Sequence, residues 1–158
     1  MGPIVCQKAP DFYLPRDGGA YLSLQDLAGK AVVLYFYPKD MTPGCTTEAL
    51  DFRNRAGEFE KAGGTIVGIS RDSPARHDKF IAKNKLNFIL ISDETGDTCK
   101  AYGVWQLKKF MGREFMGIVR TTFIINPEGM ITSIWSKVRV KGHVDEVLRT
   151  IKKFQKNE

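Results

Sequence analysis

Residues 31–45 read AVVLYFYPKDMTPGC, and this stretch decides the fold class. Its first seven residues form a continuous apolar and aromatic run, which is typical of a central strand covered on both faces. A loop rich in proline and glycine follows. Cys45 then opens a helical segment that reaches about Lys61 and stops at Gly63-Gly64, a typical C-terminal signal. The order predicts a buried strand, a loop at its carboxyl end and a helix that begins with a cysteine.

The same alternation of short strands and helices continues along the chain. Strands are predicted at 65–70 and 88–91, and the helix between them begins at Ser73-Pro74 and ends near Lys85. The remaining expected elements are a short helix over 97–102, a hairpin over 121–135 and a terminal helix from about 144 to 154. Gly18-Gly19 lies between two short apolar segments and suggests an extra hairpin before the main sheet.

This order favours an α/β chain with a thioredoxin-like architecture. We expect a central mixed sheet with helices on both faces, the parallel strands first and the antiparallel strands last, and an extra N-terminal β-hairpin. With 158 residues the chain has the length of one domain, so we expect 1–158 to form a single domain.

Composition excludes several function classes. Charged residues make up 27% of the chain and apolar ones 42%, which is ordinary for a globular protein, and no apolar run approaches the ~20 residues of a membrane span. The N-terminus lacks the pattern of a signal peptide, so a cytoplasmic location is expected. The net charge of +6 comes from scattered basic residues without a nucleic-acid-binding motif, so we interpret it as a solvated surface and expect no nucleic-acid or membrane partner.

The three cysteines, at 6, 45 and 99, contain no close pair. An odd number of isolated cysteines argues against a secreted disulfide framework and against a paired-cysteine zinc site. The two histidines, His77 and His143, are far apart in sequence and have too few nearby acidic or cysteine partners to form a metal site, so none is predicted. We expect His77 on the solvent side of its helix and His143 near the start of the last helix.

Cys45 has the strongest chemical signal in the chain. The unpaired N–H groups and the dipole of a helix start favour an anion, and a thiolate is such an anion. Cys45, Ala49, Phe52, Ala56 and Phe59 follow the spacing of one helix face. The other members of that face are apolar, so the thiol is expected to point inward, to the floor of a pocket.

Each neighbour of Cys45 has a functional and a structural interpretation, and both remain open. Thr42 is a candidate to bond a substrate oxygen or merely to satisfy loop backbone. Pro38 and Pro43 either wall the pocket or only shape the turn. Arg120, just before the 121–126 strand, either holds the thiolate and polarises a leaving oxygen or is an exposed charge.

Taken together, these residues resemble the peroxiredoxins, through the pattern Pro38-x-x-x-Thr42-x-x-Cys45. The chain looks most like the branch called bacterioferritin comigratory proteins, and the resemblance covers nearly its whole length. Further segments that read like that branch are 9–12, 35–39, 68–70, 90–93, 103–105, 110–112 and 117–120.

The resemblance implies a thiol peroxidase. The Cys45 thiolate would attack hydrogen peroxide or an alkyl hydroperoxide and become a sulfenic acid, with Thr42 and Arg120 orienting the peroxide and Pro38 shielding the sulfur. It implies no metal or organic cofactor, and electrons supplied by thioredoxin or another thiol. It also implies a monomer, with a dimer as the alternative.

The chain departs from the branch at its second thiol. Many members carry a resolving cysteine five residues after the first, where this chain has Leu50, and others carry it in the next helix, where none is found. The favoured hypothesis is therefore a one-cysteine mechanism resolved by an external thiol. Resolution by Cys99, expected as a buried filler, or by Cys6, in the N-terminal segment, is the alternative.

Two other functions are weighed against a peroxidase. A disulfide oxidoreductase would need Cys-x-x-Cys, but Thr42 precedes Cys45 by three residues and Glu48 follows it by three. A non-catalytic, chaperone-like module would use Cys45 only structurally. The role of Glu48 is open, since a carboxylate near the sulfur would oppose thiolate formation.

Overall fold

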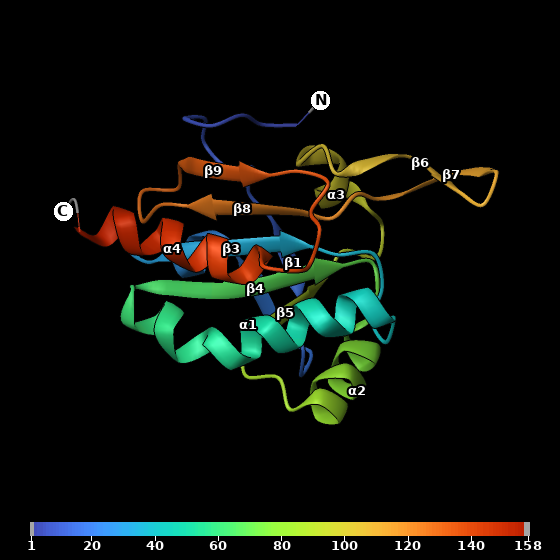
Figure 1. Cartoon of the computed structure of the whole chain (residues 1–158), viewed down its shortest axis with the longest axis horizontal. Helices are drawn as coiled ribbons and strands as arrows, with labels where there is room; N and C mark the ends of the chain where they lie inside the picture. Colours follow the sequence, from blue (N-terminus) through green and yellow to red (C-terminus); the bar gives the residue numbers. More distant parts are fainter. Residues whose placement is uncertain (1, 157–158) are drawn as a thin grey trace.

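The computed structural model describes residues 2–156 (Figure 1). In chain order the strands are β1 Tyr13–Pro15, β2 Tyr21–Ser23, β3 Ala31–Phe36, β4 Gly64–Ser70, β5 Ile89–Ser92, β6 Trp105–Phe110, β7 Arg113–Ile118, β8 Thr121–Ile125 and β9 Ile131–Trp135. The helices are η1 Gln25–Leu27, a 3₁₀ turn, α1 Pro43–Lys61, α2 Pro74–Asn84, α3 Asp97–Ala101 and α4 His143–Lys156.

The central sheet has five strands in the order β5-β4-β3-β8-β9. Neighbours among β3, β4 and β5 are parallel, whereas β8 pairs antiparallel with both β3 and β9. The parallel part thus comes first in the chain and the antiparallel part last, which confirms the predicted mixed sheet. In this register Phe36, at the end of β3, lies opposite Thr121, at the start of β8. This pairing brings the residue before Thr121 to the edge of the sheet where α1 begins.

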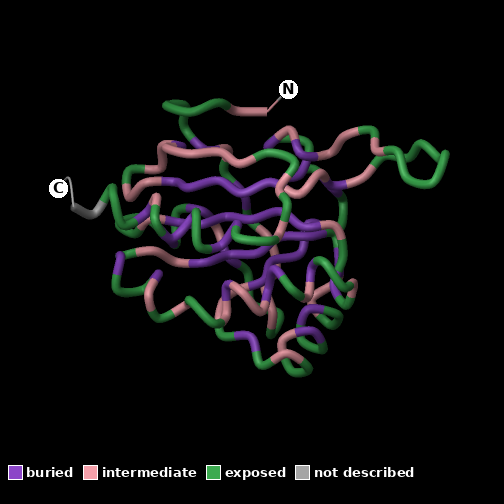
Figure 2. Tube along the Cα trace, in the orientation of Figure 1, coloured by how far each residue is buried: buried purple, intermediate pink, exposed green. Residues whose placement is uncertain are grey.

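Both faces of the sheet are covered, because successive side chains of β3 point in opposite directions. Val33, Tyr35 and the following Tyr37 join a buried cluster with residues of α1, α2 and α4. Val32, Leu34 and Phe36 join a second cluster with residues from β2, η1 and α3. Figure 2 shows that burial is concentrated in the central strands between these layers. The expected thioredoxin-like α/β fold, with helices on both faces, is confirmed.

The extra N-terminal hairpin is also confirmed. β1 and β2 pair antiparallel, and the turn between them contains Gly18 and Gly19 with φ of 80° and 94°. Both values lie in the left-handed region, which glycine enters without steric cost. The glycine pair therefore makes this turn possible.

A second hairpin, formed by β6 and β7, was not expected from the sequence. It projects from the body of the molecule beyond the edge of the sheet (Figure 1). Its exposed large apolar side chains are Leu107, Phe110, Met111, Phe115 and Met116. Because both faces of this ribbon carry apolar and charged residues, the period-2 alternation that identifies a half-buried strand is weak here.

One expectation was wrong: His77 does not lie on the solvent side of α2. Its side chain is completely buried, and it shares the buried side of the helix with Phe80, three residues later. Both of its ring nitrogens have hydrogen-bond partners, which makes the burial of a polar ring tolerable. His143 begins α4, as predicted.

Within residues 2–156, no helix combines the length and apolar character needed to cross a membrane. The same residues contain no group of three or more histidine, cysteine and acidic side chains placed to hold a metal ion.

Candidate active site

Cys45 lies in the first turn of α1, at the third helical position after the N-cap residue Thr42. Its side chain is 2% exposed and belongs to the cluster that also contains Ala49 and Phe52 of the same helix face. The thiol therefore points inward, in agreement with the helix-face argument.

The start of α1 leaves hydrogen-bond donors open beside the thiol. Pro43, the first helical residue, has no N–H, and the first helical bond runs from the Thr46 N–H to the Thr42 carbonyl. The N–H groups of Gly44 and Cys45 precede that bond, and such groups at a helix start have no intrahelical acceptor. The Thr42 hydroxyl donates to the Lys39 carbonyl at 2.8 Å instead of capping the helix. The turn before the helix thus presents free donors and leaves the lone pairs of the Thr42 oxygen available to accept.

Arg120 reaches the sulfur from the segment between β7 and β8. Its Nη2 donates to Cys45 Sγ at 3.3 Å, while its Nη1 donates to Glu48 Oε1 at 2.6 Å. The backbone of Arg120 is held in turn, because its carbonyl accepts from the Val138 N–H at 3.0 Å. The guanidinium passes so close to Gly44 that a Cβ there would lie 3.3 Å from Nη2. A fixed cation therefore contacts the thiol directly.

Glu48 is the buried partner of this cation. Its carboxylate is inaccessible, and Oε2 has no hydrogen-bond partner among the described residues. Burial raises the pKa of Glu48 to about 7, against the lowering effect of the neighbouring Arg120 guanidinium. Around neutral pH the Arg120 guanidinium is therefore shared between Cys45 and a carboxyl group that is close to its own titration point.

Two further polar groups surround the site. The Tyr35 hydroxyl is buried without a hydrogen-bond partner in the part of the chain that the structure describes, and burial, with the nearby Glu48 carboxylate, raises the pKa of Tyr35 well above its ordinary value. Lys108 of β6 donates to the Ile118 carbonyl at 2.9 Å, and partial burial, with the Arg120 charge, lowers the pKa of Lys108. The positive charges of Lys108 and Arg120 are thus close enough to interact.

The structure brings three of the four predicted site residues into one arrangement: Cys45 and Arg120 are in contact, and Thr42 directly precedes the helical turn that contains Cys45. Pro38 is half-buried, two residues beyond the end of β3, and lies at the same edge of the sheet. Sequence reasoning did not identify Glu48 as the partner of Arg120. The available signal was its position three residues after Cys45, which places both side chains on adjacent parts of one helix face.

Cys99 and Cys6 both lie away from Cys45. Cys99 is completely buried in the cluster on the opposite face of the sheet, and burial, with the adjacent Asp93 carboxylate, raises the pKa of its thiol strongly. The exposed Cys6 pairs through its N–H with the carbonyl of Ile131. Ile131 lies at the end of the sheet where β3 begins, whereas Cys45 lies where β3 ends. The six residues of β3 separate these ends by roughly 17 Å.

Comparisons with known proteins identify relatives of this chain. The model of the AhpC/TSA family matches residues 5–134. Peroxiredoxin Bcp of Bacillus subtilis is 51% identical, over 92% of this chain and 93% of that protein. Peroxiredoxin Bcp of Escherichia coli is 42% identical, over 91% of this chain and 92% of that protein. A solved structure of the bacterioferritin comigratory protein of Xanthomonas campestris, studied for its alkyl peroxide reduction activity, superposes with a TM-score of 0.87. It is 45% identical and covers 91% of this chain and 92% of its own.

Proposed function

The chain belongs to the AhpC/TSA family and is a thiol peroxidase of the peroxiredoxin Bcp type, and we propose that Cys45 is the residue that its peroxide substrate oxidises. The observation that carries this assignment is the contact between Arg120 Nη2 and Cys45 Sγ, which is 3.3 Å long and partly buried. A cation at hydrogen-bond distance favours the thiolate, which is the nucleophilic form of the residue.

The proposed reaction follows from the groups around the sulfur. The Cys45 thiolate attacks one peroxide oxygen, so that an S–O bond forms, the O–O bond breaks and the second oxygen leaves with the electron pair. That oxygen takes up a proton and departs as water or, from an alkyl hydroperoxide, as an alcohol. Negative charge that develops on the oxygens is stabilised by the Arg120 guanidinium and the open N–H groups of Gly44 and Cys45.

Thr42 and Pro38 complete the proposed site. The Thr42 hydroxyl, which donates to Lys39, can accept a hydrogen bond from the protonated peroxide oxygen and so orient it. Pro38, half-buried two residues beyond the end of β3, is the residue proposed to shield the sulfur. Alkyl hydroperoxides are included among the substrates because the related Xanthomonas campestris protein was studied for alkyl peroxide reduction.

The resulting sulfenic acid is resolved by an external thiol in this proposal. Three facts support it: Cys99 lies beyond the sheet, Cys6 lies at its far end, and position 50, within α1, is a leucine. A disulfide within the chain would require part of the sheet or its covering layer to come apart. Thioredoxin or a comparable protein thiol is the proposed reductant, acting on a monomer; the three unpaired cysteines suit a reducing compartment such as the cytoplasm.

The assignment of Cys45 is tested by peroxide consumption with dithiothreitol as reductant. We expect Cys45→Ser to lose consumption, because the hydroxyl that replaces the thiol is not ionised near neutral pH. Cys99→Ser is the matched control, since it alters a buried thiol outside the site, and should consume peroxide at the wild-type rate. Equal rates for wild type and Cys45→Ser would instead support a non-catalytic, chaperone-like module.

The one-cysteine mechanism is tested by mass spectrometry under non-reducing conditions. After one equivalent of peroxide, we expect Cys45 to carry a sulfenic acid that reacts with dimedone, with Cys6 and Cys99 still free. An intramolecular disulfide between Cys45 and Cys99, or between Cys45 and Cys6, as the main product would contradict the mechanism while leaving Cys45 as the oxidised residue.

A further inference from the structure

Asp40 is a buried carboxylate in the turn that precedes the active-site helix. Its exposed fraction is 1%, whereas its neighbours Lys39 and Met41 are exposed. The Tyr37 hydroxyl donates to Asp40 Oδ1 at 2.6 Å, and His77 Nδ1 lies 2.7 Å from Asp40 Oδ2. Both carboxylate oxygens are therefore engaged, one by the end of β3 and the other by α2.

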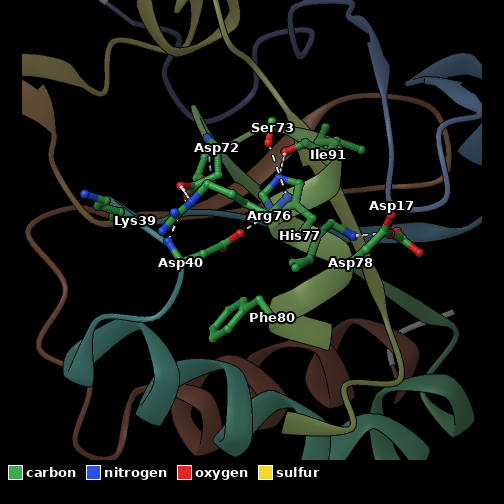
Figure 3. A network of polar contacts seen from close by, with 12 residues as sticks. Asp17, Lys39, Asp40, Asp72, Ser73, Arg76, His77, Asp78, Phe80 and Ile91 are labelled. Atoms are coloured by element: carbon green, nitrogen blue, oxygen red, sulfur yellow. Dashed lines mark hydrogen bonds and ion pairs between the residues drawn. The ribbon is translucent and has the colours of Figure 1, made fainter. Parts of the chain in front are cut away.

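His77 carries this connection across to β5. Its Nε2 lies 3.0 Å from the Ile91 carbonyl, and the ring is fully buried (Figure 3). A carbonyl only accepts, so Nε2 must carry a hydrogen and donate it. His77 therefore links the turn to α2 and β5 through two well-formed hydrogen bonds.

A second connection fixes the backbone of the same residue. The Asp40 N–H donates to Asp72 Oδ2 at 2.8 Å, and that oxygen also accepts from the Ser70 hydroxyl at 2.7 Å. The other Asp72 oxygen accepts from Arg76 Nε at 3.0 Å. Side chain and main chain of Asp40 are thus both attached to the segment 70–77, as Figure 3 shows.

The turn needs this attachment because its conformation is unfavourable. Met41 has a φ of 70°, and a side chain in the left-handed region costs about 1–2 kcal/mol. Such a conformation persists where surrounding contacts impose it. The contacts that do so are those of Asp40, immediately before Met41. Thr42, immediately after Met41, is the last residue before the helix that carries Cys45.

We propose that Asp40 and His77 act as a clamp, a pair of positioning residues that holds Thr42 and the first turn of α1 in register with Arg120. This inference rests on the proposed role of Cys45. Neither clamp residue touches the substrate. Their effect reaches the reaction through the turn, which sets where the sulfur, the open N–H groups and the Thr42 hydroxyl lie relative to one another.

Two substitutions of His77 distinguish the loss of the bond to Asp40 from a general loss of fold stability. In His77→Asn the amide nitrogen replaces Nδ1 and keeps the bond to Asp40, while the bond to Ile91 is lost. In His77→Gln the amide nitrogen replaces Nε2, so the bond to Ile91 stays and the bond to Asp40 is lost. Each variant loses one buried hydrogen bond, so comparable decreases in melting temperature are expected.

Only one of the two variants should oxidise slowly. The second-order rate constant for oxidation of Cys45 by hydrogen peroxide, measured by competition in stopped flow, is expected to fall about tenfold or more in His77→Gln and to stay within about threefold of wild type in His77→Asn. Asp78→Asn, which weakens only the bond from the Gly18 N–H to the same helix, is the control and should oxidise at the wild-type rate. Equal slowing of both His77 variants, or slowing of neither, would overturn the clamp.

Substitution of Asp40 provides an independent test of the clamp. In Asp40→Asn the amide oxygen can accept from Tyr37 and the amide nitrogen can donate to neutral His77, so oxidation within about threefold of wild type is expected, whereas Asp40→Ala should slow it about tenfold or more. If Asp40→Asn oxidises as slowly as Asp40→Ala, the charge rather than the position of Asp40 matters, and the clamp is refuted. Failure of wild-type Cys45 to be oxidised at all would refute the proposed function instead.

Discussion

Arg120 contacts two groups that compete for its charge. One hydrogen bond reaches the Cys45 sulfur and the other reaches Oε1 of the buried Glu48 carboxylate. The second carboxylate oxygen, Oε2, has no hydrogen-bond partner among the described residues. A guanidinium donates in a fixed fork, so the bond to Glu48 also determines where the second nitrogen points. Glu48 thereby orients the cation, which answers the question that its position in the sequence left open.

Arg120→Lys tests whether the fixed geometry of the guanidinium, and not only its charge, is needed. An ammonium keeps the charge but cannot bond Glu48 and Cys45 in the same fixed geometry, so the rate constant for oxidation of Cys45 by peroxide should fall about 100-fold. Stopped-flow competition measures it. Arg55→Lys is the matched control, because Arg55 pairs with Glu58 and Asp145 on the exposed side of α1, and it should leave the rate unchanged. A wild-type rate in Arg120→Lys would show that charge alone is sufficient.

Glu48 makes the stability of the fold depend on pH. Its folded pKa is raised from 4.5 to about 7, so the folded state binds more protons than the unfolded state between these values. The stability that Glu48 contributes is therefore fully present below pH 4.5 and is lost as the pH rises through 7. Glu48→Gln does not titrate, so the wild type should lose about 3 kcal/mol of unfolding free energy relative to this variant across the window.

Urea denaturation of both proteins at several pH values measures this difference. His143 changes stability in the opposite sense, because burial lowers its pKa to about 4 and its contribution is lost as the pH falls from 6.5. Since both proteins contain His143, that contribution cancels in the comparison. A difference between wild type and Glu48→Gln that does not vary with pH would show that Glu48 titrates normally.

At the scale of elements, α1 combines a first turn that carries the proposed active-site cysteine with an ordinary helical body. Gly44 lies in the first turn, where an added Cβ would come within 3.3 Å of Arg120 Nη2. Gly57 lies in the exposed middle of the same helix, where an added Cβ meets nothing within 4 Å. The two glycines thus differ in function although they share one helix.

Replacement of each glycine by alanine should have different effects. Gly57→Ala should raise the unfolding free energy by about 0.5–1 kcal/mol, since glycine weakens a helix interior, and leave oxidation unchanged. Gly44→Ala should displace the guanidinium by a few tenths of an ångström and slow oxidation of Cys45 by about fivefold. Denaturant titration and stopped flow measure the two quantities. Equal oxidation rates in the two variants would mean that Arg120 accommodates the methyl group.

The sequence predicted the elements whose hydrophobic pattern matches their burial. The continuous run at 31–37 became β3, the glycine pair at 18–19 became a turn, and Cys45 points inward with Ala49 and Phe52. His77 was misplaced because a lone polar residue on a helix is usually solvated. Its partners Asp40 and Ile91 lie 37 and 14 residues away in the chain, and only the folded sheet brings them together.

The contact between Arg120 and Cys45 was predicted only as one of two possibilities. It spans 75 residues and depends on the antiparallel pairing of β8 with β3, which places Thr121 opposite Phe36. Local patterns indicate which residues form strands but not the register between strands distant in sequence. The β6–β7 hairpin was missed for a related reason, since it pairs mainly with itself and buries little.

At the scale of the whole molecule, that projecting hairpin should be the site most sensitive to trypsin. Lys109 and Arg113 flank its exposed tip at Met111 and Gly112 (Figures 1 and 2). We expect the first cleavage after Lys109 or Arg113, because exposed tips with few supporting contacts open most easily. Mass spectrometry of early fragments identifies the site. Replacement of both residues by glutamine should remove the early fragments, and first cuts within α1 or α4 would contradict the prediction.

The positions of the three thiols on this framework also determine what happens when reductant is scarce. With Cys99 beyond the sheet and Cys6 at its far end, no neighbouring thiol shortens the lifetime of a sulfenate at Cys45. In the proposed one-cysteine cycle, a second hydrogen peroxide then adds another oxygen to the sulfur and releases water, which yields a sulfinic acid that ordinary thiols do not reverse. We therefore expect the fraction of chains in this state to grow with each excess of peroxide over reductant, so that a population of this protein would keep a cumulative record of oxidative exposure.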